Sequence, residues 1–302
     1  MVKSIGLFLG LMTLDFSYLT AKYPQPNEKI VALDYGVMAG GPATNAAITF
    51  QALNNQSILG GSLGQHPLTQ LIRSDLINYK IQLIDLDTSR LEPPPVSSIL
   101  IPQGTGERTV VSINAIKSQI QRQTILEWSQ KQSQLLDSLD IILIDGHQMI
   151  ASEEIAKFAS DKNIPIVIDA GSWKPGFELV LPQADFVIGS ENFYPPGCQT
   201  QAEVFEYLIT LGIDKIAITH GEQPIDYWEQ GQWGQIPAPA ITPVDTLGAG
   251  DIFHGAFCHF ILTKSFTEAL TEAAKIASYS CQFLGTRQWI SNFGVIISTE
   301  LA

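Results

Sequence analysis

The sequence is poor in charge and in cysteine, and both shortages restrict what the protein does. Only 16% of the 302 residues are charged, and 17 Lys and Arg stand against 30 Asp and Glu, giving a net charge of −13. Nucleic acids and anionic membrane surfaces attract clustered basic side chains, so neither is expected as a partner. The three cysteines, Cys198, Cys258 and Cys281, form no CxxC pair. Reduced thiols and a cytoplasmic location are therefore expected.

Long apolar runs are also missing. A membrane-spanning helix needs about 20 apolar residues, and the apolar run 5–14 is ended by Asp15 without a signal-peptide cleavage site. We expect this run to form a buried first strand. The run holds only Gly6 and Gly10, so it lacks the GxGxxG fingerprint that a nicotinamide-dependent oxidoreductase requires. The histidines show no metal-ligand spacing, which leaves a zinc site without support.

The remaining composition favours a large α/β domain. Hydrophobic residues make up 45% of the chain and its mean hydropathy is +0.13, so a sizeable core is expected. Short apolar strands alternate with helices from residue 121 onwards, which predicts a mainly parallel sheet covered on both faces. The predicted helices are 121–137, 152–162 and 201–211, and the strands are 141–144, 166–168, 186–188 and 215–219. Ligands bind at the carboxyl ends of such strands, where Asp145, Asp169 and Thr219 lie.

The most informative stretch is Asp-Thr-Leu-Gly-Ala-Gly-Asp at 245–251, followed by an apolar helical run at 252–262. The first N–H groups of a helix lack internal partners and lie at the positive end of the dipole. Gly248, Ala249 and Gly250 have almost no side chain, so a phosphoryl group can approach these amides closely. Asp251 beside them suits a base that takes a proton from an attacking hydroxyl.

The same stretch also suits an ordinary capped helix. In that interpretation Asp245 or Thr246 is the N-cap, the glycines form the turn, and Asp251 complements the helix dipole. The local pattern alone leaves both interpretations open.

Two motifs together resemble a known family. The stretch 245–251 resembles the C-terminal signature of the ribokinase-like (PfkB) carbohydrate kinases, Asp-Thr-x-Gly-Ala-Gly-Asp. Gly40, Gly41, Asn45 and Ala47 resemble the N-terminal signature, Gly-Gly-x-x-x-Asn-x-Ala. The resemblance implies a three-layer α/β/α fold with a mainly parallel sheet and a small β-sheet lid, in one domain spanning 1–302. It also implies that Asp251 is the catalytic base and that the amides of 248–250 form the anion hole.

The resemblance further implies a sugar site and a lid. Asp15, the amides of Gly40 and Gly41, and the Asn45 side chain would contact sugar hydroxyls. Arg108 would reach the transferring phosphate or the nucleotide. Asp15 equally suits a turn and Arg108 an exposed solubilising side chain. The lid segments are expected at about 12–38 and 96–114, with strands at 18–23, 29–37, 97–101 and 109–113, and in many family members the lid also forms a homodimer interface.

ATP is the implied co-substrate, with Mg²⁺ bridging its phosphates and keeping several waters. The nucleotide neighbours implied by the resemblance are Thr219, His220, Gly221, Thr246, Gly248, Gly250, Ala277 and Cys281. Ala277 and Cys281 belong to a helix predicted at 266–284, beside the adenine. The family's Asn-x-x-Glu motif is broken here, because the corresponding residues are Ser190-Glu191-Asn192-Phe193; Glu191 and Asn192 are the available substitutes.

These features predict an ATP-dependent sugar kinase that phosphorylates a primary hydroxyl. The stretch 10–15 and Arg108-Thr109-Val110 resemble the ketohexokinase branch, which makes a ketose such as fructose the expected acceptor. A nucleoside kinase is the alternative within the same chemistry, and Phe16 and Tyr18 are available to stack on a base. A catalytically idle sugar or nucleotide sensor is the alternative from another class.

Overall fold

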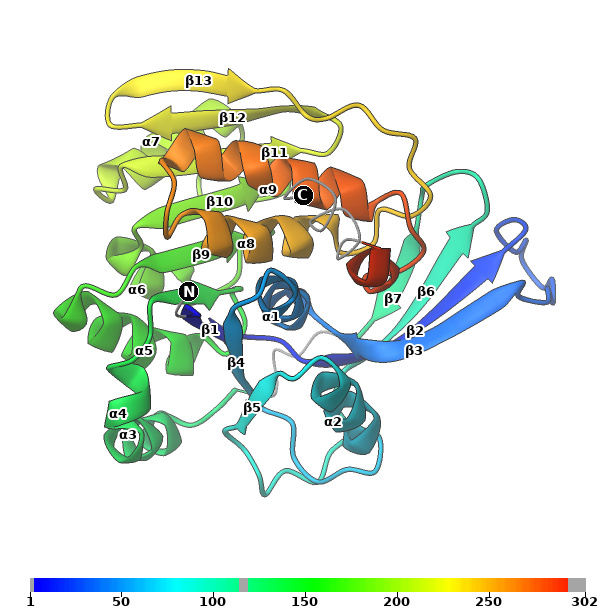
Figure 1. Cartoon of the computed structure of the whole chain (residues 1–302), viewed down its shortest axis with the longest axis horizontal. Helices are drawn as coiled ribbons and strands as arrows, with labels where there is room; N and C mark the ends of the chain where they lie inside the picture. Colours follow the sequence, from blue (N-terminus) through cyan, green and yellow to red (C-terminus); the bar gives the residue numbers. More distant parts are fainter. Residues whose placement is uncertain (1–2, 114–118, 293–302) are drawn as a thin grey trace, which may run out of the picture.

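The structure, a computed structural model describing residues 3–113 and 119–292, is built on a nine-stranded sheet (Figure 1). The strand order is β13-β12-β11-β10-β9-β8-β1-β4-β5. Neighbouring strands are parallel, except that β12 is antiparallel to both β11 and β13. The strands are β1 Ile5–Leu9, β4 Gln56–Gly61, β5 Gln82–Asp85, β8 Ile141–Ile144, β9 Ile166–Ala170, β10 Phe186–Ser190, β11 Lys215–His220, β12 Gln223–Glu229 and β13 Gln232–Ile236.

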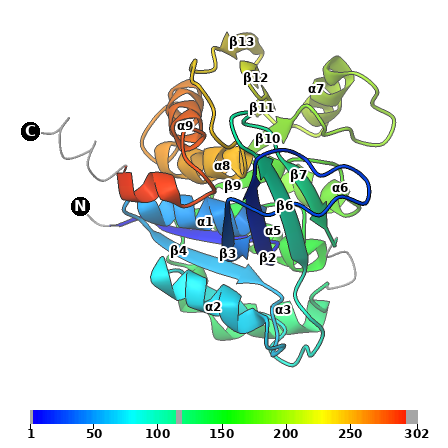
Figure 2. The same ribbon diagram turned by 90° about the vertical axis from the view of Figure 1, so that its right-hand side faces the viewer.

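Helices cover both faces of this sheet. In Figure 2, α1, α8 and α9 lie on one side, and α5, α6 and α7 lie on the other. The helices are α1 Pro42–Ala52, α2 Thr69–Asn78, α3 Arg122–Lys131, α4 Ser133–Leu136, α5 Met149–Lys162, α6 Phe177–Val180, α7 Gln201–Thr210, α8 Ala249–Phe260 and α9 Phe266–Ser280, with a 3₁₀ turn at Leu181–Gln183. Two large apolar clusters, one on each face, form the core.

A second, four-stranded sheet projects beyond the large one, at the right of Figure 1. Its order is β3-β2-β6-β7, with β2 Thr13–Thr20, β3 Asp34–Gly40, β6 Val96–Pro102 and β7 Thr109–Ser112. Only β2 and β6 are parallel within it. The predicted fold class, a mainly parallel α/β/α domain with a small accessory sheet, is confirmed.

Some predicted boundaries were wrong. The strands expected at 18–23 and 29–37 are β2 and β3, which begin at Thr13 and Asp34 and pair from Thr13 opposite Gly40 to Leu19 opposite Asp34. In this register Thr13, Asp15 and Ser17 lie on one face of β2, and Phe16 and Tyr18 lie on the other. The bounds of the two strands are set by their pairing with each other. The helix expected at 121–137 divides at Gln132 into α3 and α4, and the helix expected at 266–284 ends at Ser280. Residue 114, the end of the predicted lid segment, lies outside the described residues.

Candidate active site

The start of α8 is open on the side where a phosphoryl group would approach. Gly248 is the N-cap, with φ of +69°, a left-handed value that glycine adopts without strain. The Ile252 amide donates to the Gly248 carbonyl at 2.8 Å, so the amides of Ala249, Gly250 and Asp251 precede the internal ladder of the helix. The Ala249 amide also makes a 3.3 Å turn bond to the Thr246 carbonyl. Gly250 is exposed, and a Cβ there would meet no atom within 4 Å.

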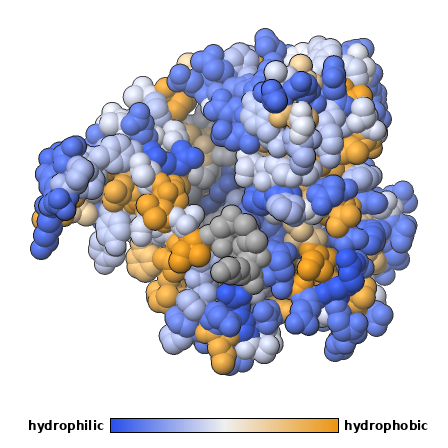
Figure 3. Space-filling model, turned by 180° about the vertical axis from the view of Figure 1, so that it is seen from behind, coloured by the Kyte–Doolittle hydropathy of each residue, from blue (hydrophilic) through white to orange (hydrophobic). Residues whose placement is uncertain are grey.

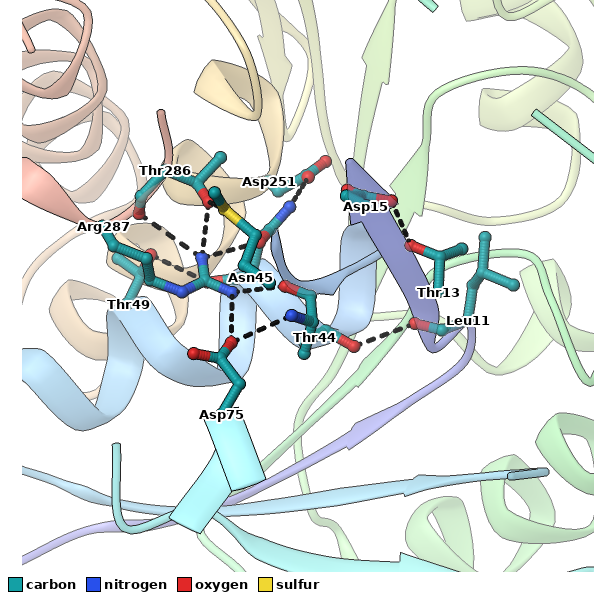
Figure 4. A network of polar contacts seen from close by, with 12 residues as sticks. Leu11, Thr13, Asp15, Thr44, Asn45, Thr49, Asp75, Asp251, Thr286 and Arg287 are labelled. Atoms are coloured by element: carbon teal, nitrogen blue, oxygen red, sulfur yellow. Dashed lines mark hydrogen bonds and ion pairs between the residues drawn. The ribbon is translucent and has the colours of Figure 1, made fainter. Parts of the chain in front are cut away.

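Asp251 is partly buried in the first turn of α8. One carboxylate oxygen, Oδ2, accepts a 2.7 Å hydrogen bond from Nδ2 of Asn45 on α1 (Figure 4). Burial, reinforced by the negative charge of Asp169 at the end of β9, raises the pKa of Asp251 to about 7, against the lowering effect of the Asn45 bond. A carboxyl group with such a pKa exchanges protons readily near neutral pH.

Helix packing brings Asn45 and Asp251 together. Helices α1 and α8 meet at Gly255, where a Cβ would overlap the Ala46 carbonyl oxygen. Asn45 is 4% exposed and follows Gly40 and Gly41 at the entry to α1. The two signature motifs, about 200 residues apart in sequence, therefore meet at one pair of side chains.

Asp15 lies at the other side of the site, on β2. It is 9% exposed, and the Thr13 hydroxyl donates to its Oδ1 at 2.7 Å. Burial raises the pKa of Asp15 above its ordinary value, although the hydroxyls of Thr13 and Ser97 oppose the shift. Any Cβ on Gly40 would overlap the Asp15 carboxylate, and Gly41 has φ of +99° beside the Leu11 carbonyl. These two glycines are required so that β3 and α1 pass this close to Asp15 and Leu11.

Asp145, at the end of β8, organises the crevice where the strand order reverses around β1. Its Oδ2 accepts from the amides of Leu11 at 2.8 Å and Ala43 at 3.0 Å, and its Oδ1 accepts from the His147 amide at 2.9 Å. Burial works to raise the pKa of Asp145, but His147 and these amides hold it below its ordinary value. Asp145 thus joins β1, β8 and α1, and it has this structural role whatever ligand binds nearby.

Arg108 contacts the signature loop. It is exposed at the β6–β7 hairpin, and one guanidinium nitrogen donates to the Thr246 hydroxyl at 2.8 Å. That hydroxyl in turn donates to the Gly106 carbonyl at 3.0 Å, and Gly106 forms an isolated β-bridge with Asp245. The small sheet and the signature loop are therefore in direct contact.

The other predicted nucleotide neighbours fall into two places. Thr219 and His220 end β11, and Gly221 follows it. The His220 ring lies between two side chains: its Nδ1 is 3.2 Å from Nε2 of Gln201, and its Nε2 is 3.1 Å from Oδ2 of Asp226. Ala277 and Cys281 are buried along α9, and the Cys281 carbonyl accepts from the amides of Val244 at 2.8 Å and Asp245 at 3.1 Å. Cys281 therefore supports the signature loop through its backbone carbonyl. Burial raises the pKa of its thiol.

Sequence reasoning missed the segment after α9. Asp245 accepts a 2.8 Å hydrogen bond from the Gly285 amide, and Arg287 donates to Asn45 Oδ1 at 2.8 Å (Figure 4). The predicted helix end at 284 left these residues outside any motif, and no local signal marks them. The described residues contain no group of three or more His, Cys, Asp or Glu that would cage a metal ion, and none of their helices is long and apolar enough to cross a membrane.

A carboxylate at the open start of a helix, beside the carboxyl edge of a parallel sheet, suits transfer of a phosphoryl group to an alcohol. The comparisons agree. The model of the family described as "pfkB family carbohydrate kinase" matches residues 7–291. The chain therefore belongs to this family, and it is a phosphotransferase whose acceptor is an alcohol group.

Individual relatives match over almost the full length. The chain is 23% identical to ribokinase of Bacillus subtilis over 284 residues, covering 91% of this chain and 92% of that protein. It is 21% identical to deoxyribokinase of Salmonella typhimurium over 289 residues, covering 92% and 93%. The solved structure of Arabidopsis thaliana ribokinase complexed with ribose and ATP superposes with a TM-score of 0.72 at 20% identity, covering 94% of each chain.

Proposed function

We propose that this enzyme transfers the γ-phosphoryl group of ATP to a primary hydroxyl of a sugar. The observation that carries the proposal is Asp251, a carboxyl with a pKa of about 7 in the first turn of α8, next to the exposed Gly250. Asp251 takes the hydroxyl proton, and the amides of Gly248, Ala249 and Gly250 stabilise negative charge on the transferred group. The base suits removal of the hydroxyl proton, and the electropositive start of the helix suits stabilisation of the transferred phosphoryl group.

The acceptor site lies between the small sheet and α1. Asp15, Asn45 and the backbone of Gly40 and Gly41 bind the sugar hydroxyls, and the small sheet acts as a lid that excludes water. The face of β2 and β6 that carries Asp15 also carries Thr13, Ser17 and Ser97, all less than 9% exposed. Small hydroxyl side chains of this kind suit a compact polyol.

A sugar fits this surface better than a nucleoside. Phe16 and Tyr18 alternate with Asp15 along β2, and side chains of a strand point alternately to opposite faces. The two aromatic rings therefore lie on the face away from Asp15, where they have no base to stack on. Among sugars, the relatives named ribokinase and deoxyribokinase favour a pentose, whereas the stretch 10–15 favours a ketose such as fructose.

ATP binds along the carboxyl ends of β10 and β11. Thr219, His220, Gly221 and Thr246 line the nucleotide, Ala277 and Cys281 lie beside the adenine, and Arg108 reaches the phosphates from the lid. Mg²⁺ bound to the phosphates keeps several waters and needs nearby acids rather than a protein cage. Asp169 and Glu191, from neighbouring strands β9 and β10, fit this requirement. When bound, the ion would neutralise phosphate charge.

The outer face of the lid supports a homodimer. Cross-strand neighbours Tyr18 and Tyr35 are 36% and 72% exposed, and Val37 and Val111 on the same face are 38% and 69% exposed. Figure 3 shows apolar side chains gathered on the projecting arm. Adjacent exposed apolar side chains favour association, and a second copy of the chain is the partner we propose. A cytoplasmic location agrees with the free thiols among the described residues.

The test is ADP release from Mg-ATP across ribose, deoxyribose, fructose, other aldoses and ketoses, and nucleosides, with Asp251→Asn beside the wild type. Sugar-dependent release by the wild type, reduced at least about 100-fold in the variant with both substrates still bound, is expected. ADP release with nucleosides only would identify the enzyme as a nucleoside kinase instead. Ligand-induced thermal shifts without any release would identify a sensor.

A further inference from the structure

The side chain of Asn45 has a partner on each side. Its Nδ2 donates to Asp251 Oδ2 at 2.7 Å, and its Oδ1 accepts from a guanidinium nitrogen of Arg287 at 2.8 Å (Figure 4). A guanidinium group has donors and no acceptor, so only the amide oxygen of Asn45 can face Arg287. The bond to Arg287 therefore determines that the NH₂ group faces Asp251.

Arg287 is itself held firmly. Its side chain is 10% exposed, and it donates to the Thr286 hydroxyl at 2.7 Å and to the Ala39 carbonyl at 2.6 Å. Asp75 of α2 lies 3.8 Å from the second terminal nitrogen, and the ring of Tyr79 lies under the guanidinium, 5.4 Å from its carbon. Asp75 also accepts from the Ala39 amide at 2.9 Å. Four segments, from β3, α1, α2 and the tail after α9, thus fix one cation.

The arrangement is costly for a merely structural contact. Burying a charge carries a large desolvation penalty, and the Nε of Arg287 is buried with no hydrogen-bond partner among the described residues. An apolar side chain would join the same four segments without either cost. The orientation of the Asn45 amide is what an apolar side chain would not provide.

We propose that Arg287 is a positioning residue for phosphoryl transfer, which orients Asn45 so that its NH₂ group holds one oxygen of the Asp251 carboxylate. The other oxygen is left to receive the proton of the acceptor hydroxyl. The orienting effect of Arg287 passes through Asn45, separately from the attraction between its charge and Asp251, and the inference rests on the proposed role of Asp251 as base.

Loss of the orientation has a recognisable signature. The Asn45 bond lowers the pKa of Asp251 against the effect of burial, so a freely rotating amide favours the protonated, inactive carboxyl. Without Arg287, the acidic limb of the pH profile of kcat/KM should move to higher pH. Loss of the Arg287 charge moves the limb in the same direction, so Arg287→Lys, which keeps the charge and loses the planar fork, isolates the effect of the orientation. A contact that only supports the fold would lower thermal stability and leave this limb in place.

The experiment is a double-mutant cycle of Arg287→Met and Asn45→Ala, with kcat, KM and the pH profile measured for each variant. We expect Arg287→Met to lower kcat by about 10-fold to 100-fold, to move the acidic limb upward, and to add less than about 3-fold when Asn45 is already Ala. Arg73→Met is the matched control, because Arg73 also pairs with a carboxylate, Asp85, at 2.6 Å, away from Asn45. It should leave kcat and the acidic limb unchanged.

Two outcomes would overturn the proposal: independent effects of the two substitutions that multiply in the double variant, or an unmoved acidic limb in Arg287→Met. If Arg287→Met does not fold, Arg287→Lys, which keeps the charge beside Asp75 and loses the planar fork, is measured in the same cycle. Full activity of Asp251→Asn would instead refute the proposed base, a result distinct from failure of the cycle.

Discussion

Nδ1 of His254 lies 3.6 Å from Oδ2 of Asp169, beneath the first turn of α8. The same nitrogen is 2.7 Å from the Gly250 carbonyl oxygen, and Nε2 is 3.1 Å from that of Ile188. These two contacts hold the imidazole of His254 between α8 and β10, beside the Asp169 carboxylate.

His254 lowers the pKa of Asp251. His254→Asn should therefore raise the pKa of Asp251 and lower kcat/KM at pH 6.5 by about 3-fold to 10-fold, with less effect at pH 8.5. Identical pH profiles of kcat/KM for this variant and the wild type would disprove this account.

The raised pKa of Asp251 predicts the pH dependence of turnover. A base is active only as its carboxylate, so kcat/KM should fall about tenfold for each pH unit below pH 7 and level off above it. Steady-state kinetics between pH 5.5 and 9 measures this limb. A plateau that extends down to pH 5 would mean that Asp251 is not the group being titrated.

The same shift predicts that Asp251 destabilises the fold at high pH. The native carboxyl, with a pKa of about 7, binds its proton more tightly than the unfolded one at 3.8, so the free energy of unfolding falls as pH rises from about 4 to 7. Asp251→Asn should therefore raise the free energy of unfolding at pH 8 by about 4 kcal/mol more than at pH 4. Urea denaturation at both pH values tests this, with the exposed Asp137→Asn as the control.

Gly255→Ala should separate α1 from α8. The added methyl would overlap the Ala46 carbonyl oxygen and approach the Thr49 side chain at 2.7 Å. Overpacking of this kind costs about 1 to 3 kcal/mol, and it displaces Asn45 from Asp251, so both the melting temperature and kcat should fall. Ser278→Ala, on the neighbouring helix α9, is the control and should change neither by much.

The lid face predicts the assembly. Tyr35→Glu would place a charge at a 72% exposed site on the proposed interface, and sedimentation velocity should show a homodimer becoming a monomer. Leu179→Glu, a 49% exposed apolar position on α6, should leave the dimer intact. A wild-type protein that sediments as a monomer at all concentrations would refute the proposed dimer.

Local signals predicted much of the fold. Residues 141–144 were predicted to form a buried strand because all four side chains are apolar, and they form β8. The bounds of β2 and β3 did not follow, because they depend on pairing register rather than on composition. The glycine signatures located Asn45 and Asp251, but their contact depends on helix packing between distant segments.

Arg287 was beyond the reach of sequence reasoning for the same reason. Apart from the adjacent Thr286, its polar partners are Ala39, Asn45 and Asp75, all more than 200 residues away, and nothing in its sequence neighbours distinguishes it from a surface arginine. Arg108 was predicted to reach the phosphate or the nucleotide, and the structure adds that its side chain donates to Thr246 in the signature loop.

The contact of Gly106 and Arg108 with Asp245 and Thr246 joins the small sheet directly to the signature loop. In the proposed function, a sugar that draws the small sheet inward would also shift Thr246. The affinities for sugar and ATP would then depend on each other, and thermodynamic linkage requires each ligand to change the affinity of the other by the same factor. We therefore expect this hairpin to couple the binding of the acceptor to the binding of ATP.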